Sequence, residues 1–206
     1  MKKIKVLGMG PGHRDYITPR VLQEIESAEI IVAGKRILDS IEVNDKKIIY
    51  ITRDLNVIVD KIKANYKKST VAILLSGDTG FYSMLKFLKT HFDKGDMEVI
   101  TGISSMQYMF SKIGETWDDA YITSLHGREL DIVEKVKRHS KVGILTDKKW
   151  SPQNIAKELI RSGITNKRIY VGEHLSYDDE VITSGTMEEI ASREGYRMCV
   201  VVIMDE

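Results

Sequence analysis

Apolar runs and amphipathic helical patterns alternate along the first half of the chain. Runs typical of buried strands occupy residues 3–7, 29–33, 48–51, 71–75 and 97–100. Between them, apolar side chains such as Leu55, Ile58 and Ile62 recur at the three- and four-residue spacing of a helix that packs on a core. Strands that alternate with helices predict an α/β domain with a largely parallel sheet.

Hydroxyl residues followed by proline predict where two of the helices begin. Thr18-Pro19 and Ser151-Pro152 each provide an N-cap and a proline at the first helical position. Further helices are expected over residues 54–66 and from residue 84 to about 92. A turn is expected at Gly34-Lys35-Arg36, which places two positive charges at the end of the second strand.

The pattern breaks near residues 114–119, and the elements that follow are more closely spaced. Strands are expected over residues 120–123, 142–145, 168–171, 181–184 and 199–204, with helices ending near residue 139 and starting at residues 151 and 186. Late strands that follow each other closely favour a mixed sheet. We therefore expect two domains, an N-terminal α/β domain over residues 1–114 and a C-terminal α/β domain over residues 115–206.

The segment SGDTGFYS, at residues 76–83, stands at the end of the most apolar strand. Ligands of open α/β sheets bind at the carboxyl ends of strands, and glycines let a ligand approach the backbone. Asp78 offers an acceptor, and Phe81 and Tyr82 offer apolar surface for a ring. Two interpretations of this segment are open: a site for a nucleoside-like ligand, or an ordinary turn in which Asp78 caps the next helix.

Composition is that of a soluble globular protein. The chain has 206 residues, of which 42% are hydrophobic and 30% are charged, enough for a sizeable core. No apolar run approaches the roughly 20 residues that span a bilayer, and no signal peptide is visible, so we expect a cytoplasmic protein without a membrane partner. The single cysteine, Cys199, lies in an apolar run and is expected to be buried and inert.

Charge is distributed unevenly within a formal net charge of +1. Residues 1–114 carry 18 Lys+Arg against 13 Asp+Glu, whereas residues 115–206 carry 13 against 17. Neither half has a dense basic stripe with interleaved aromatic residues, so nucleic-acid binding is not expected. The basic first half favours a small anionic substrate, or it is ordinary solvated surface.

Residue spacing argues against several kinds of site. The five histidines are scattered, so no metal site is expected. No serine lies in a GxSxG elbow, and no GK[ST] follows a glycine loop. The segment GMGPG at residues 8–12 departs from GxGxxG, and Pro11 removes a backbone donor that a pyrophosphate would use.

Four loops with small residues remain, each at the end of an expected strand. They are the first loop (GMGPG, residues 8–12), the second loop (SGDTGFYS, residues 76–83), the third loop (TGISS, residues 101–105) and the fourth loop (SLHGR, residues 124–128). If these loops converge, they line a site with backbone groups rather than with strong acids or bases. Such a site suits chemistry in which the cofactor carries the reactivity, for example methyl transfer from S-adenosylmethionine.

In order and spacing, the four loops resemble those of the tetrapyrrole (corrin/porphyrin) methylases over essentially the whole chain. The fourth loop and the segment GEHLSY at residues 172–177 are most similar to the family members that methylate C5 of precorrin-7 or cobalt-precorrin-7 in cobalamin biosynthesis. The chain departs from the commoner family pattern at Thr79 and Thr101, where proline is frequent. Neither change removes an expected ligand group, so they bear on the rigidity of the loops.

The resemblance implies two α/β domains with S-adenosylmethionine in the cleft between them, and a homodimer. The residues that it implies as cofactor contacts are Pro11, Gly77, Asp78, Phe81, Ser104, Ser105, Leu125 and His126, with residues 172–175 nearby. The side chains expected to meet substrate carboxylates are Arg14, Lys35, Arg36 and Arg128. No catalytic side chain is assigned, because Asp78 is interpreted as seating the cofactor rather than as an acid.

The implied reaction is methylation of carbon C5 of a corrinoid precursor. The chain has room for this activity only, so methylation of C15 with decarboxylation is expected to belong to a separate partner enzyme. Two alternatives are considered. One is another methylase of the same fold, acting on a different corrin precursor or on diphthamide precursors; the other is a dinucleotide-binding oxidoreductase or regulatory domain that uses the first loop.

Overall fold

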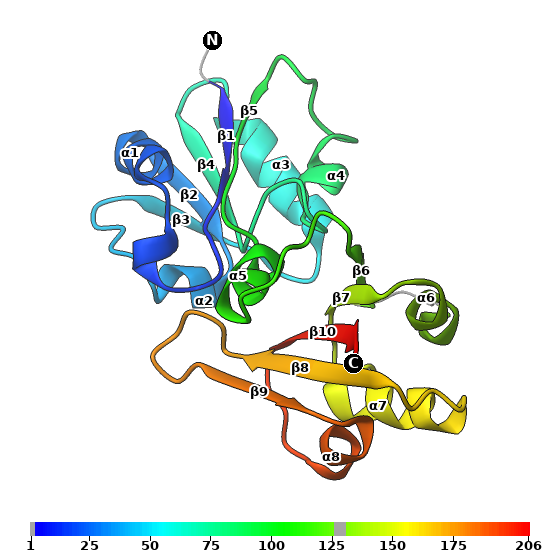
Figure 1. Ribbon diagram of the computed structural model, residues 1–206. Helices are drawn as coiled ribbons and strands as arrows, with labels where there is room; N and C mark the ends of the chain where they lie inside the picture. The colour runs from blue at the N-terminus through cyan, green and yellow to red at the C-terminus, as the bar shows by residue number, and fades with distance from the viewer. Residues whose placement is uncertain (1–2, 126–130) are drawn as a thin grey trace. The chain divides into compact units, whose positions relative to one another are not determined.

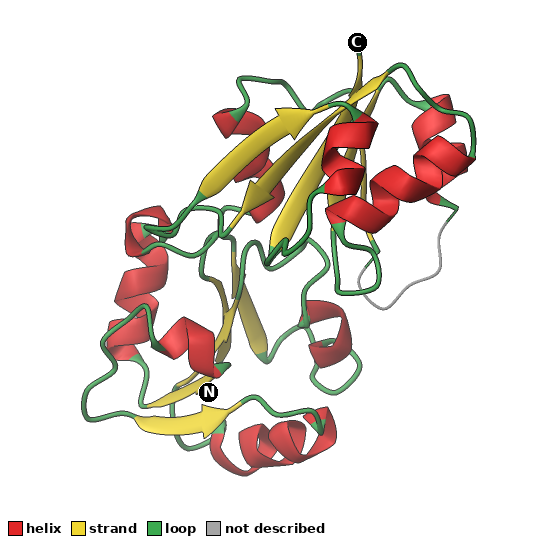
Figure 2. Cartoon of the chain, turned by 90° about the horizontal axis from the view of Figure 1, so that it is seen from below, coloured by secondary structure: helices red, strands yellow, loops and turns green. Residues whose placement is uncertain are grey.

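The computed structural model describes residues 3–125 and 131–206 and contains two compact units, Met1–Ser104 and Ser105–Glu206 (Figure 1). Each unit is built on one five-stranded sheet with helices beside it (Figure 2), which confirms the predicted α/β fold class. Within the described residues, none of the helices combines the length and the apolar character needed to cross a membrane.

The sheet of the first unit is entirely parallel, as the alternating pattern predicts. Its strands are β1 (Ile4–Gly8), β2 (Ile30–Ala33), β3 (Lys47–Tyr50), β4 (Val71–Leu75) and β5 (Met97–Ile100). They follow the order β3-β2-β4-β1-β5. Strand β1 therefore lies between β4 and β5, and the carboxyl ends of these three strands are neighbours at one edge.

Helices cover both faces of this sheet. They are α1 (Pro19–Ser27), α2 (Lys35–Leu38), α3 (Leu55–Asn65) and α4 (Leu85–Leu88), with the 3₁₀ helix η1 (Arg14–Tyr16) before α1. Leu7 of β1 packs with α1 on one face, and Val6 packs with α3 and α4 on the other. Burial on both faces of the sheet explains why the inner strands β2 and β4 are continuous apolar runs.

The sheet of the second unit is mixed, as predicted. Its strands are β6 (Tyr121–Ser124), β7 (Lys141–Leu145), β8 (Lys167–Glu173), β9 (Val181–Gly185) and β10 (Cys199–Asp205), in the order β6-β7-β10-β8-β9. Strand β10 is antiparallel to β7 and β8, and β6 is parallel to β7. Hence β6, β7 and β8 all end at the same edge of this sheet.

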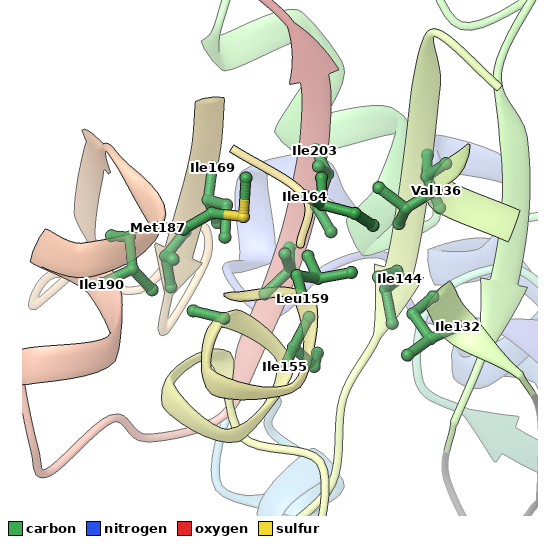
Figure 3. Close-up of a cluster of buried hydrophobic side chains, with 14 of the residues drawn as sticks. Ile132, Val136, Ile144, Ile155, Leu159, Ile164, Ile169, Met187, Ile190 and Ile203 are labelled. Atoms are coloured by element: carbon green, nitrogen blue, oxygen red, sulfur yellow. The ribbon is translucent and has the colours of Figure 1, made fainter. Parts of the chain in front are cut away.

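The second unit buries its main core on one face of the sheet. Helices α6 (Ile132–Arg138), α7 (Pro152–Arg161) and α8 (Met187–Ser192) contribute apolar side chains there. In Figure 3, Ile155 and Leu159 of α7 lie beside strand residues such as Ile144 and Ile203. These side chains are at most 1% exposed, so this cluster forms a continuous core.

Helix α5 (Ser105–Lys112) belongs to the second unit, so the division lies before it rather than at the predicted boundary of 114/115. A Cβ atom at Gly143 would lie 2.6 Å from Met106 Sδ, and one at Gly172 would lie 2.6 Å from Met109 Sδ. The glycines of β7 and β8 thus let α5 approach the face opposite the main core. The break in pattern at residues 114–119 marks the end of this helix.

Capping residues explain where the helices start. Thr18 Oγ1 accepts a hydrogen bond from Val21 N, and Ser151 Oγ accepts one from Asn154 N, as the Thr-Pro and Ser-Pro pairs predict. Two expectations differ from the structure. Residues Lys35–Leu38 form a short helix capped by Gly34, where a turn is expected, and helix α4 ends at Leu88.

Candidate functional site

The first three loops converge at the carboxyl edge of the first unit's sheet. They follow β1, β4 and β5, which are neighbours, so their convergence is a consequence of strand order. Gly10 and Gly77 exchange two backbone hydrogen bonds, with Gly77 N donating to Gly10 O at 2.8 Å and Gly10 N donating to Gly77 O at 3.2 Å. Both glycines have positive φ, +78° and +72°, a conformation that favours glycine.

Glycine is required where the three loops touch. A Cβ atom at Gly8 would lie 2.5 Å from the backbone nitrogen of Gly102 and 2.9 Å from the carbonyl oxygen of Gly77. A Cβ atom at Gly102 would lie 2.5 Å from the same carbonyl oxygen. The first three loops therefore contact one another through their backbones. Where they meet, peptide groups rather than side chains line the carboxyl edge of the sheet.

Asp78 joins the second loop to the third loop. Its Oδ2 accepts hydrogen bonds from Thr101 Oγ1 at 2.6 Å and Gly102 N at 3.2 Å, and its Oδ1 accepts one from Gly80 N at 2.7 Å. Partial burial opposes ionisation, but these hydrogen bonds outweigh it and hold the pKa of Asp78 below its ordinary value. Asp78 is therefore an anionic acceptor within the loops and is poorly suited to act as an acid.

Asp78 does not cap the following helix, so the interpretation of residues 76–83 as a simple capped turn is wrong on this point. Helix α4 begins at Leu85, after Met84, and Met84 makes no side-chain cap. Ser83 Oγ instead accepts a hydrogen bond from Leu85 N at 3.1 Å and donates to Thr79 O. The second loop is thus a closed structure of its own between β4 and α4.

The other residues expected near a cofactor in the first unit lie on the same three loops. Pro11 and Ser104 are buried, and Phe81 is half-buried. The Phe81 and Tyr82 rings are edge-to-face with centroids 4.8 Å apart, and Tyr82 has a φ of +49°, which is unusual for a residue with a side chain. The structure therefore brings Pro11, Ser104 and Phe81 to the edge that Gly77 and Asp78 share.

The basic residues expected to meet a substrate are divided between two places. Lys35 and Arg36 are exposed at the carboxyl end of β2, next to β4 in the sheet. Arg14 lines a cavity of about 490 Å³ formed with α1 and residues 41–46, and neither Lys35 nor Arg36 lines it. Arg128 lies outside the described residues.

In the second unit, the residues of interest lie where β6 and β8 end. Leu125 is fully buried in the core, and its N–H donates to Leu145 O at 2.9 Å. Ser105 begins α5. His126 lies outside the described residues.

The segment after β8 has a constrained backbone. His174 and Ser176 have φ values of +46° and +69°, and Leu175 between them is buried against Gly172. Glu180 holds this turn, because it accepts a hydrogen bond from Ser176 N at 2.7 Å and pairs with Lys112 Nζ at 2.8 Å. Burial opposes ionisation of Glu180, but Lys112 and the Ser176 N–H hold its pKa below the ordinary value.

Cys199 is buried, as expected, and burial raises the pKa of its thiol to about 12.

Sequence reasoning missed the hydrogen-bonding role of Thr101. Its position before Gly102 marked it only as a departure from a common pattern. Its contact with Asp78 depends on the β4-β1-β5 order, in which the two loops are separated by one strand, and no local sequence signal carries that order. The one local feature that pointed to this contact was a hydroxyl side chain at the end of a strand.

Comparison with known proteins gives a consistent result. The sequence pattern of the Tetrapyrrole (Corrin/Porphyrin) Methylases matches residues 3–191. A protein of Methanocaldococcus jannaschii named "Probable cobalt-precorrin-7 C(5)-methyltransferase" is 37% identical over 199 residues, 92% of each chain. The cobalt-precorrin-7 C(5)-methyltransferase of Salmonella typhimurium is 33% identical over 203 residues, 98% of this chain and 99% of that protein.

Solved structures agree on the fold. The uroporphyrin-III C-methyl transferase of Thermus thermophilus, complexed with S-adenyl homocysteine, superposes with a TM-score of 0.78 at 18% identity, covering 98% of this chain and 97% of the other. The sequence matches extend over nearly the whole chain. The chain therefore belongs to the tetrapyrrole (corrin/porphyrin) methylase family.

Proposed function

We propose that this chain is an S-adenosylmethionine-dependent methyltransferase that methylates C5 of cobalt-precorrin-7 or precorrin-7 in cobalamin biosynthesis. The observation that carries the proposal is the backbone contact among Gly8, Gly77 and Gly102, which makes a peptide-lined edge at the carboxyl ends of three parallel strands. The C5-methylating relatives, matched from end to end, support the position of methylation.

The residues at this edge fit the cofactor. An adenosine needs flat apolar surface and backbone groups at close range, and the edge offers Phe81 beside glycines that carry no side chain. When bound, S-adenosylmethionine supplies a methyl group already activated by a positive sulfur, so a carbon nucleophile can take it without a strong protein acid or base. A site made of peptide groups is adequate for that chemistry.

The roles that follow for this chain are binding and orientation. We assign cofactor contacts in the first unit to Pro11, Gly77, Phe81 and Ser104, with Asp78 fixing the second and third loops around them. The contacts expected from Ser105, Leu125 and His126 stay predictions. Orienting two reactants in line and excluding water accounts for a large part of the barrier reduction in such transfers.

The substrate is a small tetrapyrrole that carries several carboxylates. The exposed cations Lys35 and Arg36, at the end of β2, are suited to hold them, and Arg14 and Arg128 are further candidates. We also infer a homodimer, a cytoplasmic location and a separate enzyme for C15 methylation and decarboxylation. A dinucleotide-binding role is not favoured, because the first loop lacks GxGxxG and η1 intervenes before α1.

Calorimetric titration of the purified chain tests this proposal at the level of the cofactor. S-adenosylhomocysteine should bind with a stoichiometry of one per chain, and NAD should give no heat. Tight binding of NAD without binding of S-adenosylhomocysteine would reject the methyltransferase assignment.

A further inference from the structure

The side chain of Thr101 makes a contact that joins two of the loops. Thr101 is exposed at the end of β5, yet its hydroxyl donates to Asp78 Oδ2 at 2.6 Å, a short hydrogen bond to an ionised carboxylate. The second loop and the third loop are not neighbours in sequence, and β1 separates their strands in the sheet. This bond therefore bridges the two loops over the end of β1.

Two kinds of donor hold the Asp78 carboxylate. Gly80 and Gly102 use backbone N–H groups. Thr101 uses a side chain, which depends on the amino acid at that position. The hydrogen bond that spans the two loops thus depends on the hydroxyl group at position 101.

We propose that Thr101 is a positioning residue for cofactor binding, acting through Asp78 to fix the second loop against the third. This inference rests on the proposed function, because it takes the two loops to be the seat of S-adenosylmethionine. A loop that is already ordered before binding loses less entropy when the ligand arrives, so loss of the bridge lowers affinity. The fold itself retains the backbone contacts of Gly8, Gly77 and Gly102 and does not depend on the bridge.

Two substitutions at Thr101 distinguish the effect of its hydroxyl group from the effect of its side-chain volume. Thr101→Val removes the donor and keeps the volume, whereas Thr101→Ser keeps the donor. Thr90→Val is the matched control, because Thr90 is also exposed and its hydroxyl donates to Phe87 O at 2.7 Å, at the far end of α4. Each purified full-length variant is titrated with S-adenosylhomocysteine by calorimetry, and its melting temperature is recorded.

We expect Thr101→Val to raise the dissociation constant for S-adenosylhomocysteine roughly tenfold, the usual size for one hydrogen bond to a charged group. Thr101→Ser should restore affinity to within about threefold of the wild type, on the same energy scale. Thr90→Val should bind as the wild type does, and the melting temperatures of all three should differ by only a few degrees.

Equal affinity of Thr101→Val and the wild type would overturn the proposal, as would failure of Thr101→Ser to restore binding. A double-mutant cycle with Asp78→Asn adds a second criterion. The effect of Thr101→Val should shrink in the Asp78→Asn background, and full additivity would show that the two residues act independently. If the wild-type chain itself does not bind S-adenosylhomocysteine, the proposed function fails instead, so the two failures are distinguishable.

Discussion

Individual glycines decide how closely the three loops of the first unit approach one another. Gly8 and Gly102 are needed for space, because a Cβ atom on either would lie 2.5 Å from backbone atoms of a neighbouring loop. Backbone atoms cannot rotate away as the end of a flexible side chain can. The site is therefore sensitive to the addition of one methyl group.

Replacing Gly8 by alanine should separate the first loop from the third. We expect Gly8→Ala to weaken binding of S-adenosylhomocysteine by more than tenfold and to destabilise the fold by about 1–3 kcal/mol, as overpacking usually does. Gly95→Ala is the matched control, since a Cβ atom at Gly95 meets nothing within 4 Å. Calorimetry and thermal melting measure both effects, and equal binding by the two variants would contradict the close-approach account.

Lys141 is a buried cation outside the candidate site. Its side chain is 9% exposed, and its Nζ lies 2.8 Å from Thr116 O, 3.0 Å from Asp119 Oδ1 and 3.4 Å from Glu115 Oε2. Burial alone would lower the pKa of Lys141, but the two carboxylates outweigh it and raise the pKa above the ordinary value of 10.5. Lys141 thus holds the segment after α5 against β7.

Loss of this cation should destabilise the protein in a pH-dependent way. A raised pKa in the folded state means that the contribution of Lys141 is complete below pH 10.5 and is lost as the pH rises through the folded pKa. Lys141→Met should therefore lower the melting temperature by roughly 5 °C at pH 8, with the deficit shrinking above about pH 10.5. Lys148→Met, at an exposed lysine, should have little effect. A deficit that is constant from pH 8 to 11, measured by calorimetry, would refute the charge-based explanation.

At the level of elements, the hydrophobic pattern was sufficient to predict the strands, and the Thr-Pro and Ser-Pro pairs were sufficient to predict where two helices start. The five apolar runs of the first half all become parallel strands; β2 and β4 are buried throughout, whereas the edge strands β3 and β5 bury only part of their residues. The short helix α2 was missed because four residues carry no periodicity, and its N-cap Gly34 makes no side-chain cap. Helices and strands were thus predictable where apolar residues recur at a regular spacing along the sequence.

The candidate site was predictable as a set of loops but not as a set of contacts. Glycine-containing strand ends identify the first, second and third loops, and a parallel sheet places their carboxyl ends on one edge. The bond between Thr101 and Asp78 and the contact of Gly8 with Gly102 depend on strand order. Strand order is a property of tertiary structure, so local sequence does not report it.

The end of β2 offers a test of how the substrate is held. Replacing both cations, as Lys35→Gln with Arg36→Gln, should raise KM for the tetrapyrrole roughly tenfold while leaving the affinity for S-adenosylhomocysteine unchanged. The physical reason is the loss of charge attraction to substrate carboxylates, so the difference should shrink at high salt. Lys67→Gln with Lys68→Gln, an exposed pair at the end of α3, is the control. Steady-state kinetics with equal KM values for the two double variants would contradict this role.

At the scale of the whole molecule, two α/β units are joined in one chain of the length that C5-methylating relatives have. The division before α5 places the third loop's Ser104 at the end of one unit and Ser105 at the start of the next. The sequence did not show that helix α5 belongs to the second unit, because α5 packs on Gly143 and Gly172, whose strands occur far later in the chain. Long-range packing, rather than the local break in pattern, sets the boundary.

The central claim is that this chain alone transfers a methyl group to C5 of the corrinoid precursor. The most direct measurement incubates the purified protein with cobalt-precorrin-7 and S-adenosylmethionine labelled with carbon-13 in its methyl group, and locates the label by NMR. We predict one labelled methyl group on C5, with no loss of carbon dioxide. Label on a different carbon, decarboxylation by this chain alone, or no transfer at all would contradict the account.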